Sequence, residues 1–224
     1  MKTLEERLDY HFKDISLLEN ALIHSSYANE HHLGGIHSNE RLEFLGDSIL
    51  GMVVADSLYR TFPELPEGNL TRLRASLVCE NSLVLVAKEL QLGAYLKLGK
   101  GEEAGGGRTR PSINADAVEA VLAAVYLDGG IDEARRIIQR FILNNMAQAY
   151  EASRDYKTAL QELVQRKNGQ VLTYHLVGEA GPDHAKEFTM EVRLNGQAVG
   201  QGTGHSKKEA EQMAAKAAIA KLEQ

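Results

Sequence analysis

The sequence predicts an all-α domain followed by a small α+β domain whose elements run in the order α-β-β-β-α. Its length of 224 residues suits a medium-sized domain joined to a small one. Apolar residues recur at spacings of three and four through about the first 150 positions, as amphipathic helices require. The pattern changes to alternation over residues 171–204, which indicates strands. We therefore place the first domain at 1–147, a linker at 148–154 and the second domain at 155–224.

Each expected helix of the first domain is followed by residues that stop a helix. The clearest helical patterns are LLENALIHSSYA (17–28), RLEFLGDSILGMVVADSLY (41–59), ENSLVLVAKELQLG (80–93) and IDEARRIIQRFILNNM (131–146). Glycine- or proline-rich segments interrupt them at 31–35, 62–69, 100–107 and 128–130. The segment KGEEAGGG (100–107) lacks the spacing and the Ser or Thr of a P-loop, so we expect a flexible connection there.

The second domain shows three strand patterns between two helical ones. KTALQELVQRK (157–167) has helical periodicity, and SKKEAEQMAAKAAIAKLEQ (206–224) reads as a long alanine-rich helix. Between them, VLTYHLVGEA (171–180) and KEFTMEVRLNGQAVGQGTG (186–204) alternate and carry turn residues. The order helix, three strands, helix follows.

Composition limits the classes of function. The chain is 43% hydrophobic and 25% charged, as soluble globular proteins are. The N-terminus lacks the apolar region of a signal peptide, and no run approaches the ~18 residues of a membrane span, so we expect a cytoplasmic protein that contacts no membrane. Cys79 is the only cysteine, which excludes an intrachain disulfide and a multi-thiolate zinc site, and we expect it to be buried.

The net charge of -6 argues against a bulk polycation, so any contact with nucleic acid must rest on a local basic patch. Residues 155–224 carry nine basic and nine acidic side chains, so the whole deficit falls on residues 1–154.

Part of that acidity lies on one helix. Glu40, Glu43 and Asp47 step by three and four residues and share one stripe, while apolar side chains between them line another. Two such carboxylates 4 Å apart repel by about 4 kcal/mol at an effective dielectric of ~20, and a bound cation would remove this penalty.

A second helix carries a matching acidic pair. Asp116 and Glu119 lie three residues apart in NADAVEAVLAAVYL, which is otherwise apolar. Acidic pairs usually lie on a solvated face, but this run is too apolar for one, and burying unpaired carboxylates is costly. A ferritin-like di-iron bundle would need Glu-x-x-His pairs, and no glutamate here has a histidine three residues on. Two facing helices could therefore form a four-carboxylate site, and oxygen ligands favour Mg²⁺, with Mn²⁺ as a substitute.

These motifs resemble those of the bacterial ribonuclease III family. NERLEFLGDS (39–48) is similar to the family signature, SINADAVEA (112–120) to its second acidic motif, and the C-terminal pattern to the family's double-stranded-RNA-binding domain. Asn114 departs from the apolar residue expected in some relatives. The resemblance implies a ribonuclease III endonuclease fold and an Mg²⁺-dependent endoribonuclease that hydrolyses double-stranded RNA. It further implies products with 5′-phosphate and 3′-hydroxyl ends and short 3′ overhangs, and processing of ribosomal RNA precursors and other structured transcripts.

The resemblance also assigns residues of the catalytic domain. It implies that the metal ligands are Glu43, Asp47, Asp116 and Glu119, and that Asp47 and Glu119 matter most for catalysis. Further acidic residues, Glu40 and Glu67, match positions that border the cleft. Phe44 could be an ordinary core residue, but in the family its counterpart enters a pocket of a second subunit, which implies a homodimer. Arg108 and Arg110 precede the second acidic motif, and one of them could meet the RNA backbone.

The C-terminal domain carries a candidate phosphate clamp. Lys207 and Lys208 open its last helix, where free backbone N–H groups and the helix dipole favour an anion. The resemblance adds Gln161, Glu162 and His184 as contacts to successive minor grooves of duplex RNA, which such domains recognise by shape and 2′-hydroxyl groups. The alternative to the enzyme is a double-stranded-RNA-binding protein that does not cleave. Carboxylates at all four positions favour the enzyme.

Overall fold

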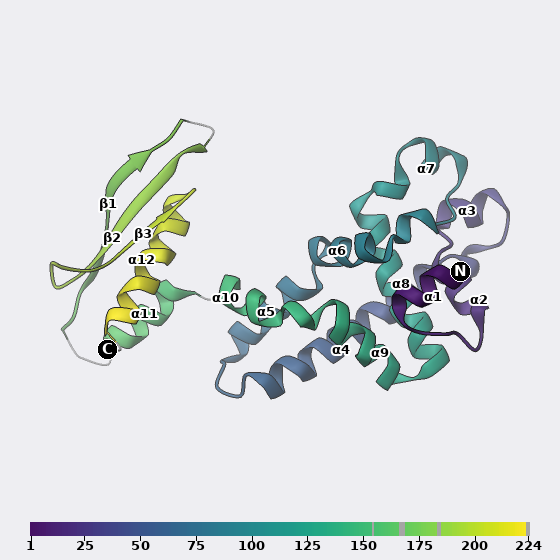
Figure 1. Ribbon diagram of the computed structural model, residues 1–224, viewed down its shortest axis with the longest axis horizontal. Helices are drawn as coiled ribbons and strands as arrows, with labels where there is room; N and C mark the ends of the chain where they lie inside the picture. The colour runs from purple at the N-terminus through teal and green to yellow at the C-terminus, as the bar shows by residue number, and fades with distance from the viewer. Residues whose placement is uncertain (154, 166–168, 183–184, 223–224) are drawn as a thin grey trace. The chain divides into compact units, whose positions relative to one another are not determined.

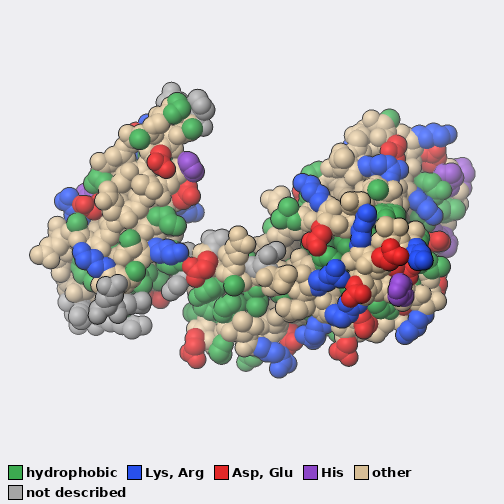
Figure 2. Space-filling view, viewed as in Figure 1, with side chains coloured by type: hydrophobic (Ala, Val, Ile, Leu, Met, Phe, Trp, Pro, Cys, Tyr) green, Lys and Arg blue, Asp and Glu red, His purple; other side chains and the backbone are tan. Residues whose placement is uncertain are grey.

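The computed structural model describes residues 1–153, 155–165, 169–182 and 185–222. The chain divides into two compact units, Met1–Ser153 and Arg154–Gln224 (Figure 1). Among the described residues, none of the helices has both the length and the apolar character that crossing a bilayer requires. Acidic and basic side chains are interspersed over the visible face of the first unit (Figure 2).

The first unit is helical, as predicted. Its α-helices are α1 (Lys2–Leu8), α2 (Ile15–Ala21), α3 (Ser25–Glu30), α4 (Glu40–Thr61), α5 (Glu67–Val78), α6 (Glu80–Leu90), α7 (Lys100–Ala104), α8 (Pro111–Gly129), α9 (Ile131–Phe141) and α10 (Met146–Ser153). Short 3₁₀ turns are η1 (Gly35–His37), η2 (Leu92–Ala94), η3 (Gly107–Thr109) and η4 (Leu143–Asn145). Several helices end where the sequence places glycine or proline, as α8 does at Gly130, whose φ is 84°.

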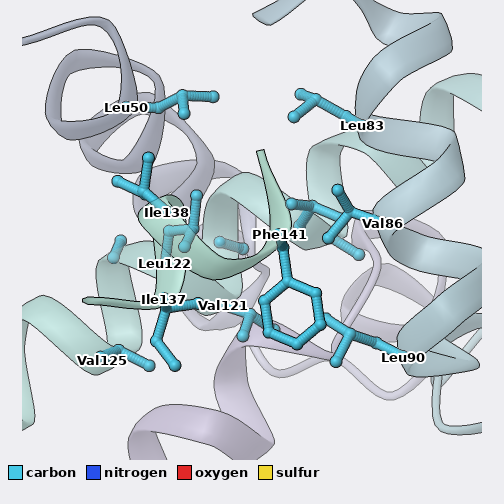
Figure 3. Packing of buried hydrophobic residues seen from close by; sticks show 14 of the residues in the cluster. Leu50, Leu83, Val86, Leu90, Val121, Leu122, Val125, Ile137, Ile138 and Phe141 are labelled. Atoms are coloured by element: carbon cyan, nitrogen blue, oxygen red, sulfur yellow. The ribbon is translucent and has the colours of Figure 1, made fainter. Parts of the chain in front are cut away.

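Helix α8 forms the centre of this unit. Buried apolar residues occur on every side of α8 between Ile113 and Val125, and a helix of that kind is stable only when neighbours surround it. Val121, Leu122 and Val125 of α8 pack among side chains of α4, α6 and α9 (Figure 3). Because α8 is enclosed, a charged side chain on it needs solvent, a bound ion or hydrogen-bond donors, as Asp128 has in the Tyr10 hydroxyl and the Lys13 N–H.

Two local expectations need revision. Cys79 is exposed, so its predicted burial is wrong: it joins α5 to α6, where its Sγ lies 3.4 Å from both the Ser76 carbonyl oxygen and Ser82 Oγ. The segment 100–107, expected to be a flexible connection, contains α7 and the start of η3. Residues 148–153 of the proposed linker are helical and continue α10, and Tyr150 stacks on Phe62 with ring centroids 4.7 Å apart.

The second unit has the predicted α-β-β-β-α order. Helix α11 (Tyr156–Gln165) precedes an antiparallel sheet of β1 (Leu172–Ala180), β2 (Glu187–Leu194) and β3 (Gln197–Gly204), and α12 (Lys207–Leu222) follows. Asn195 and Gly196, with φ of 51° and 85°, form the tight turn between β2 and β3, as an Asn-Gly hairpin requires. The core lies between the sheet and both helices and is rich in alanines of α12.

Helix α12 lies very close to strand β3. A Cβ added to Gly200, Gly202 or Gly204 would lie 2.4, 2.2 or 2.7 Å from backbone atoms of α12. The facing residues of the helix include Ala210, Ala214 and Ala218. Small side chains on both elements thus let the backbones approach, and the approach fixes where the first turn of α12 lies.

Candidate active site

The candidate site lies where α4 crosses α8. Gly46 of α4 faces the backbone of Glu119 on α8, and a Cβ at position 46 would lie 2.0 Å from the Glu119 carbonyl oxygen. Only glycine leaves room for this approach. The helices therefore meet backbone to backbone, at the point where the acidic stripes of both helices converge.

Three of the four predicted ligands gather at this crossing. Glu43, Asp116 and Glu119 each offer a carboxylate oxygen, and these oxygens all lie within 4.8 Å of one another. All three side chains are half-buried. Asp47, one turn after Glu43, is exposed and lies outside this group, although its charge acts on both Glu43 and Glu119. Such a set of oxygen donors could hold a metal ion.

The electrostatics of the site favour a cation. Burial, followed by the charges of Asp47, Glu43 and Asp116, raises the pKa of Glu119 to about 7. Burial also raises the pKa of Glu43, with contributions from Asp116, Glu40 and Asp47. Burial raises the pKa of Asp116 as well. Without a cation Glu119 therefore retains a proton over part of the neutral range, whereas a bound cation would stabilise all three groups as carboxylates.

His24 and Glu80 also act on Asp116, and the sequence patterns did not reveal either. The charge of His24 lowers the pKa of Asp116, and that of Glu80 raises it. His24 is held by Ser26: the Ser26 Oγ accepts a hydrogen bond from the Gly99 N–H (2.9 Å), so its own proton is available for His24 Nδ1 (2.8 Å). Neither residue belongs to a local motif, because only the tertiary fold brings it to Asp116.

The two residues predicted to border the cleft have local partners. Glu40 is exposed and accepts a hydrogen bond from Ser38 Oγ at 3.2 Å. Glu67, in the first turn of α5, accepts one from Thr71 Oγ1 at 2.8 Å. Glu67 also lines a pocket of about 370 Å³ between α4 and α5, together with Tyr59. Neither carboxylate belongs to the cluster of three.

Phe44 is not a core residue, since 77% of it is exposed on α4.

The two arginines before the second acidic motif are engaged within the first unit. Arg108 Nη1 donates to the carbonyl oxygens of Gly93 (2.8 Å) and Leu96 (2.9 Å), and its other nitrogens bind Glu103. Arg110 forms an ion pair with Glu102 at 2.6 Å. Through these contacts Arg108 holds η2 against the segment between α7 and α8.

In the second unit, the predicted RNA-binding residues that the structure describes are exposed. Gln161 and Glu162 lie on α11, and Lys207 and Lys208 form the first turn of α12. His184 lies outside the described residues. Ser206 caps α12, since its Oγ accepts from the Glu209 N–H (3.2 Å), while the Glu209 carboxylate accepts from the His205 N–H (2.8 Å). This cap fixes the start of the helix that carries both lysines.

Comparison with curated proteins identifies the family. A protein of Pelotomaculum thermopropionicum named Ribonuclease 3 is 53% identical over 97% of this chain and 91% of its own length. The chain belongs to the ribonuclease III family. A Ribonuclease 3 of Listeria monocytogenes is 47% identical over 98% of this chain and 96% of its own length. The family model described as Ribonuclease-III-like matches residues 14–146, and the double-stranded RNA binding motif matches residues 156–222.

The fold of the first unit is that of ribonuclease III nuclease domains. A solved nuclease domain of ribonuclease III from Campylobacter jejuni, described for flexibility in a region involved in dimer formation, is 42% identical. It covers 64% of this chain and 96% of its own, with a TM-score of 0.60. Membership of the ribonuclease III family makes the chain an endoribonuclease, and its carboxylate cluster suits the metal dependence of that family.

Proposed function

We propose that the protein hydrolyses phosphodiester bonds of double-stranded RNA with Mg²⁺ held by Glu43, Asp47, Asp116 and Glu119. Mn²⁺ should substitute, because it accepts the same oxygen ligands. The observation that carries the proposal is the half-buried cluster at the α4–α8 crossing, in which three carboxylates lie within 4.8 Å of one another. The double-stranded RNA binding motif in the same chain supports the choice of substrate.

The four carboxylates divide the work of the reaction. When bound, Mg²⁺ would polarise the phosphate and lower the pKa of an attacking water. Glu119 and Asp47 would orient the bound cations toward the scissile phosphate, and Glu43 and Asp116 would complete the ligand set. A water oxygen forms the new bond to phosphorus and the bond to the 3′ oxygen breaks, which leaves 5′-phosphate and 3′-hydroxyl ends. Glu119 must lose its proton before it can bind a cation, because its pKa is about 7.

Cleavage of a long RNA duplex tests this function directly. The full chain should cut the duplex in Mg²⁺, but not in EDTA, and a DNA duplex of the same sequence should stay intact. The product ends distinguish this chemistry from alkaline-type cleavage, which leaves 2′,3′-cyclic phosphates. A protein that bound the duplex and left it uncut in both Mg²⁺ and Mn²⁺ would contradict the proposal. Precursors of ribosomal RNA and other structured transcripts are the proposed natural substrates.

Binding of the duplex would rest on the second unit. Gln161 and Glu162 on α11, and His184 between β1 and β2, would contact successive minor grooves, with Lys207 and Lys208 on the phosphates between them. The exposure of the four described residues supports this assignment. Glu40 and Glu67 would border the cleft in which the RNA lies.

We also infer that the active protein is a homodimer joined along α4. Phe44, Met52 and Tyr59 recur at intervals of about two helical turns and are 77%, 48% and 73% exposed. A two-fold axis near Met52 would bring Phe44 of each chain to the partner's Tyr59. Tyr59 lines the pocket of about 370 Å³ with Leu58 and Leu70, and this pocket could receive a phenyl ring. The C. jejuni relative, described in terms of dimer formation, supports this inference.

A mixed dimer tests both the dimer interface along α4 and the carboxylate site. If each subunit cuts one strand, a dimer of one intact chain and one Glu119→Ala chain should nick only one strand of the duplex. Differential tags allow that species to be purified, and strand-specific end labels show which strand is broken. Double-strand cleavage by a verified, non-exchanging mixed dimer would contradict one site per strand. The Phe44→Glu variant should sediment as a monomer. If it still sedimented as a dimer, Phe44 would not belong to the dimer interface.

A further inference from the structure

Two lysines share one aromatic ring at the edge of the second unit. The Nζ atoms of Lys186 and Lys207 lie 5.6 Å and 5.8 Å from the centroid of the Phe188 ring. Both distances are within the range of a cation–π interaction. Phe188 is half-buried and packs against the second core, so the ring is a fixed support. The arrangement joins a lysine that directly precedes β2 to a lysine of α12.

Strand register explains why these residues meet. Phe188 of β2 pairs with Glu179 of β1 and with Gly204 of β3. Gly204 lies three residues before Lys207, and its close contact with the first turn of α12 holds that turn beside the strand. The cluster thus forms where the end of β1, the start of β2 and the N-terminus of α12 converge.

Glu179 supplies the negative charge in this cluster. Its Oε2 lies 2.5 Å from the Nζ of Lys186, and both side chains are about one-third exposed. The hydrogen bond from Lys186 lowers the pKa of Glu179, and the charge of Lys207 lowers it further. Lys207 itself forms no ion pair with any described residue. One carboxylate therefore serves two ammonium groups, which leaves the cluster with an excess of positive charge.

We propose that Lys186 is a phosphate contact that acts together with Lys207, and that Glu179 occupies the position of an RNA phosphate until duplex RNA binds. The inference rests on the proposed binding of double-stranded RNA and adds a residue outside the lysines of α12. Phe188 is a positioning residue, since it would hold both ammonium groups without touching the RNA. A phosphodiester would replace the carboxylate of Glu179 between the two lysines, and such charge-assisted contacts make affinity strongly dependent on salt.

The proposal predicts opposite effects for the two charged partners. Lys186→Ala should weaken binding and reduce the steepness of log K against log salt concentration by about 1, the change expected for one lost phosphate contact. Glu179→Gln should raise affinity several-fold, because a competing carboxylate is gone. In the double variant, which combines Lys186→Ala with Glu179→Gln, most of the gain in affinity from Glu179→Gln should disappear, since the two residues act as one unit.

Lys216 offers a matched control. Its Nζ lies 5.1 Å from the centroid of the Tyr156 ring, so it is also a lysine of α12 beside an aromatic ring. It lies nine residues after Lys207, or about 13 Å along the helix axis. Lys216→Ala should leave the salt dependence unchanged. Phe188→Leu keeps an apolar side chain and should weaken binding, whereas Phe188→Tyr keeps the ring and should bind as the parent does. Thermal unfolding of each variant verifies that the second unit is folded.

Fluorescence anisotropy with the full chain measures these effects. The probe is a labelled RNA duplex of roughly 20 base pairs, slightly longer than the ~16 that such domains span, titrated in EDTA between about 50 and 200 mM salt. EDTA prevents cleavage whichever residues bind the metal. Equal salt dependence for the Lys186→Ala and Lys216→Ala variants would overturn the inference, as would reduced affinity for Glu179→Gln. If the parent protein failed to bind the duplex, the proposed function itself would fall, which is a distinguishable result.

Discussion

Adding one methyl group at Gly46 should disable the candidate active site. In Gly46→Ala the new Cβ would lie 2.0 Å from the Glu119 carbonyl oxygen, and ordinary contact begins at about 3.4 Å, so α4 and α8 must separate by about 1.4 Å. Metal sites tolerate errors of only about 0.5 Å in ligand position, and a misplacement of about 1 Å can cost 100-fold in rate. We therefore expect cleavage to fall by about 100-fold or more.

The same substitution should reverse the usual effect of alanine on a helix. Gly→Ala in a helix interior normally stabilises by about 1 kcal/mol, but overpacking at this crossing should cost about 1–3 kcal/mol. Thermal unfolding in EDTA and in Mg²⁺ measures both the loss of stability and the loss of the Mg²⁺-dependent increase in melting temperature. Duplex affinity should change little, because the RNA-binding motif lies in the other unit.

Gly101→Ala provides the control for this experiment. Gly101 lies in α7, where an added Cβ meets no atom within 4 Å, so the variant should cleave RNA at the parent's rate. Parental cleavage and an unchanged melting temperature in Gly46→Ala would refute the reasoning. That result would mean that the helices are not held at backbone distance at Gly46.

Further predictions concern the ligands, the pH dependence and the second unit. Glu119→Ala or Asp47→Ala should abolish most cleavage, whereas the affinity for duplex RNA in EDTA should survive. If binding assays showed that affinity falls as much as cleavage does, the ligand assignment would be contradicted. Since the pKa of Glu119 rises from its usual 4.5 to about 7, the metal-free folded protein holds a proton between these values that the unfolded chain has lost, so its stability falls as pH rises through this window. Mg²⁺ requires the carboxylate, so the Mg²⁺-dependent rise in melting temperature should grow between about pH 5.5 and 8. An equal rise at both pH values would contradict the shift. Removal of residues 155–224 should weaken duplex binding and leave residual cleavage at low salt, and full cleavage by the truncated chain at physiological salt would contradict the proposed division of roles.

Much of the fold could be predicted because its signals are local. Periodicity of three and four marks the helices, alternation marks the strands, and Asn195-Gly196 marks a hairpin. The acidic spacing also placed Asp116 and Glu119 on one helix face. These features depend on neighbouring residues alone, so one sequence suffices to find them.

Features that depend on distant contacts could not be predicted in the same way. The approach of Gly46 to Glu119 joins helices about seventy residues apart, and nothing local marks that glycine as different from Gly51. His24 reaches Asp116 only through the tertiary fold. Cys79 is exposed because it joins two helices, although free cysteine is usually buried. In each case packing between distant elements decides what the residue does.

The backbone contact between β3 and α12 reverses the effect of side-chain size on stability at that contact. In the first unit the core consists of large side chains such as Leu50 and Ile138, so truncation to alanine should be the damaging change there. At Gly200 and Gly202 the space is already filled by α12, so truncation is impossible and enlargement should be the damaging change. A saturation-mutagenesis map of folding would therefore show Gly200 and Gly202, like Gly46 of the first unit, as positions that exclude larger residues. Selection can vary large core residues by exchanging hydrophobic side chains of similar volume, whereas the glycines that face α12 permit almost no variation in size.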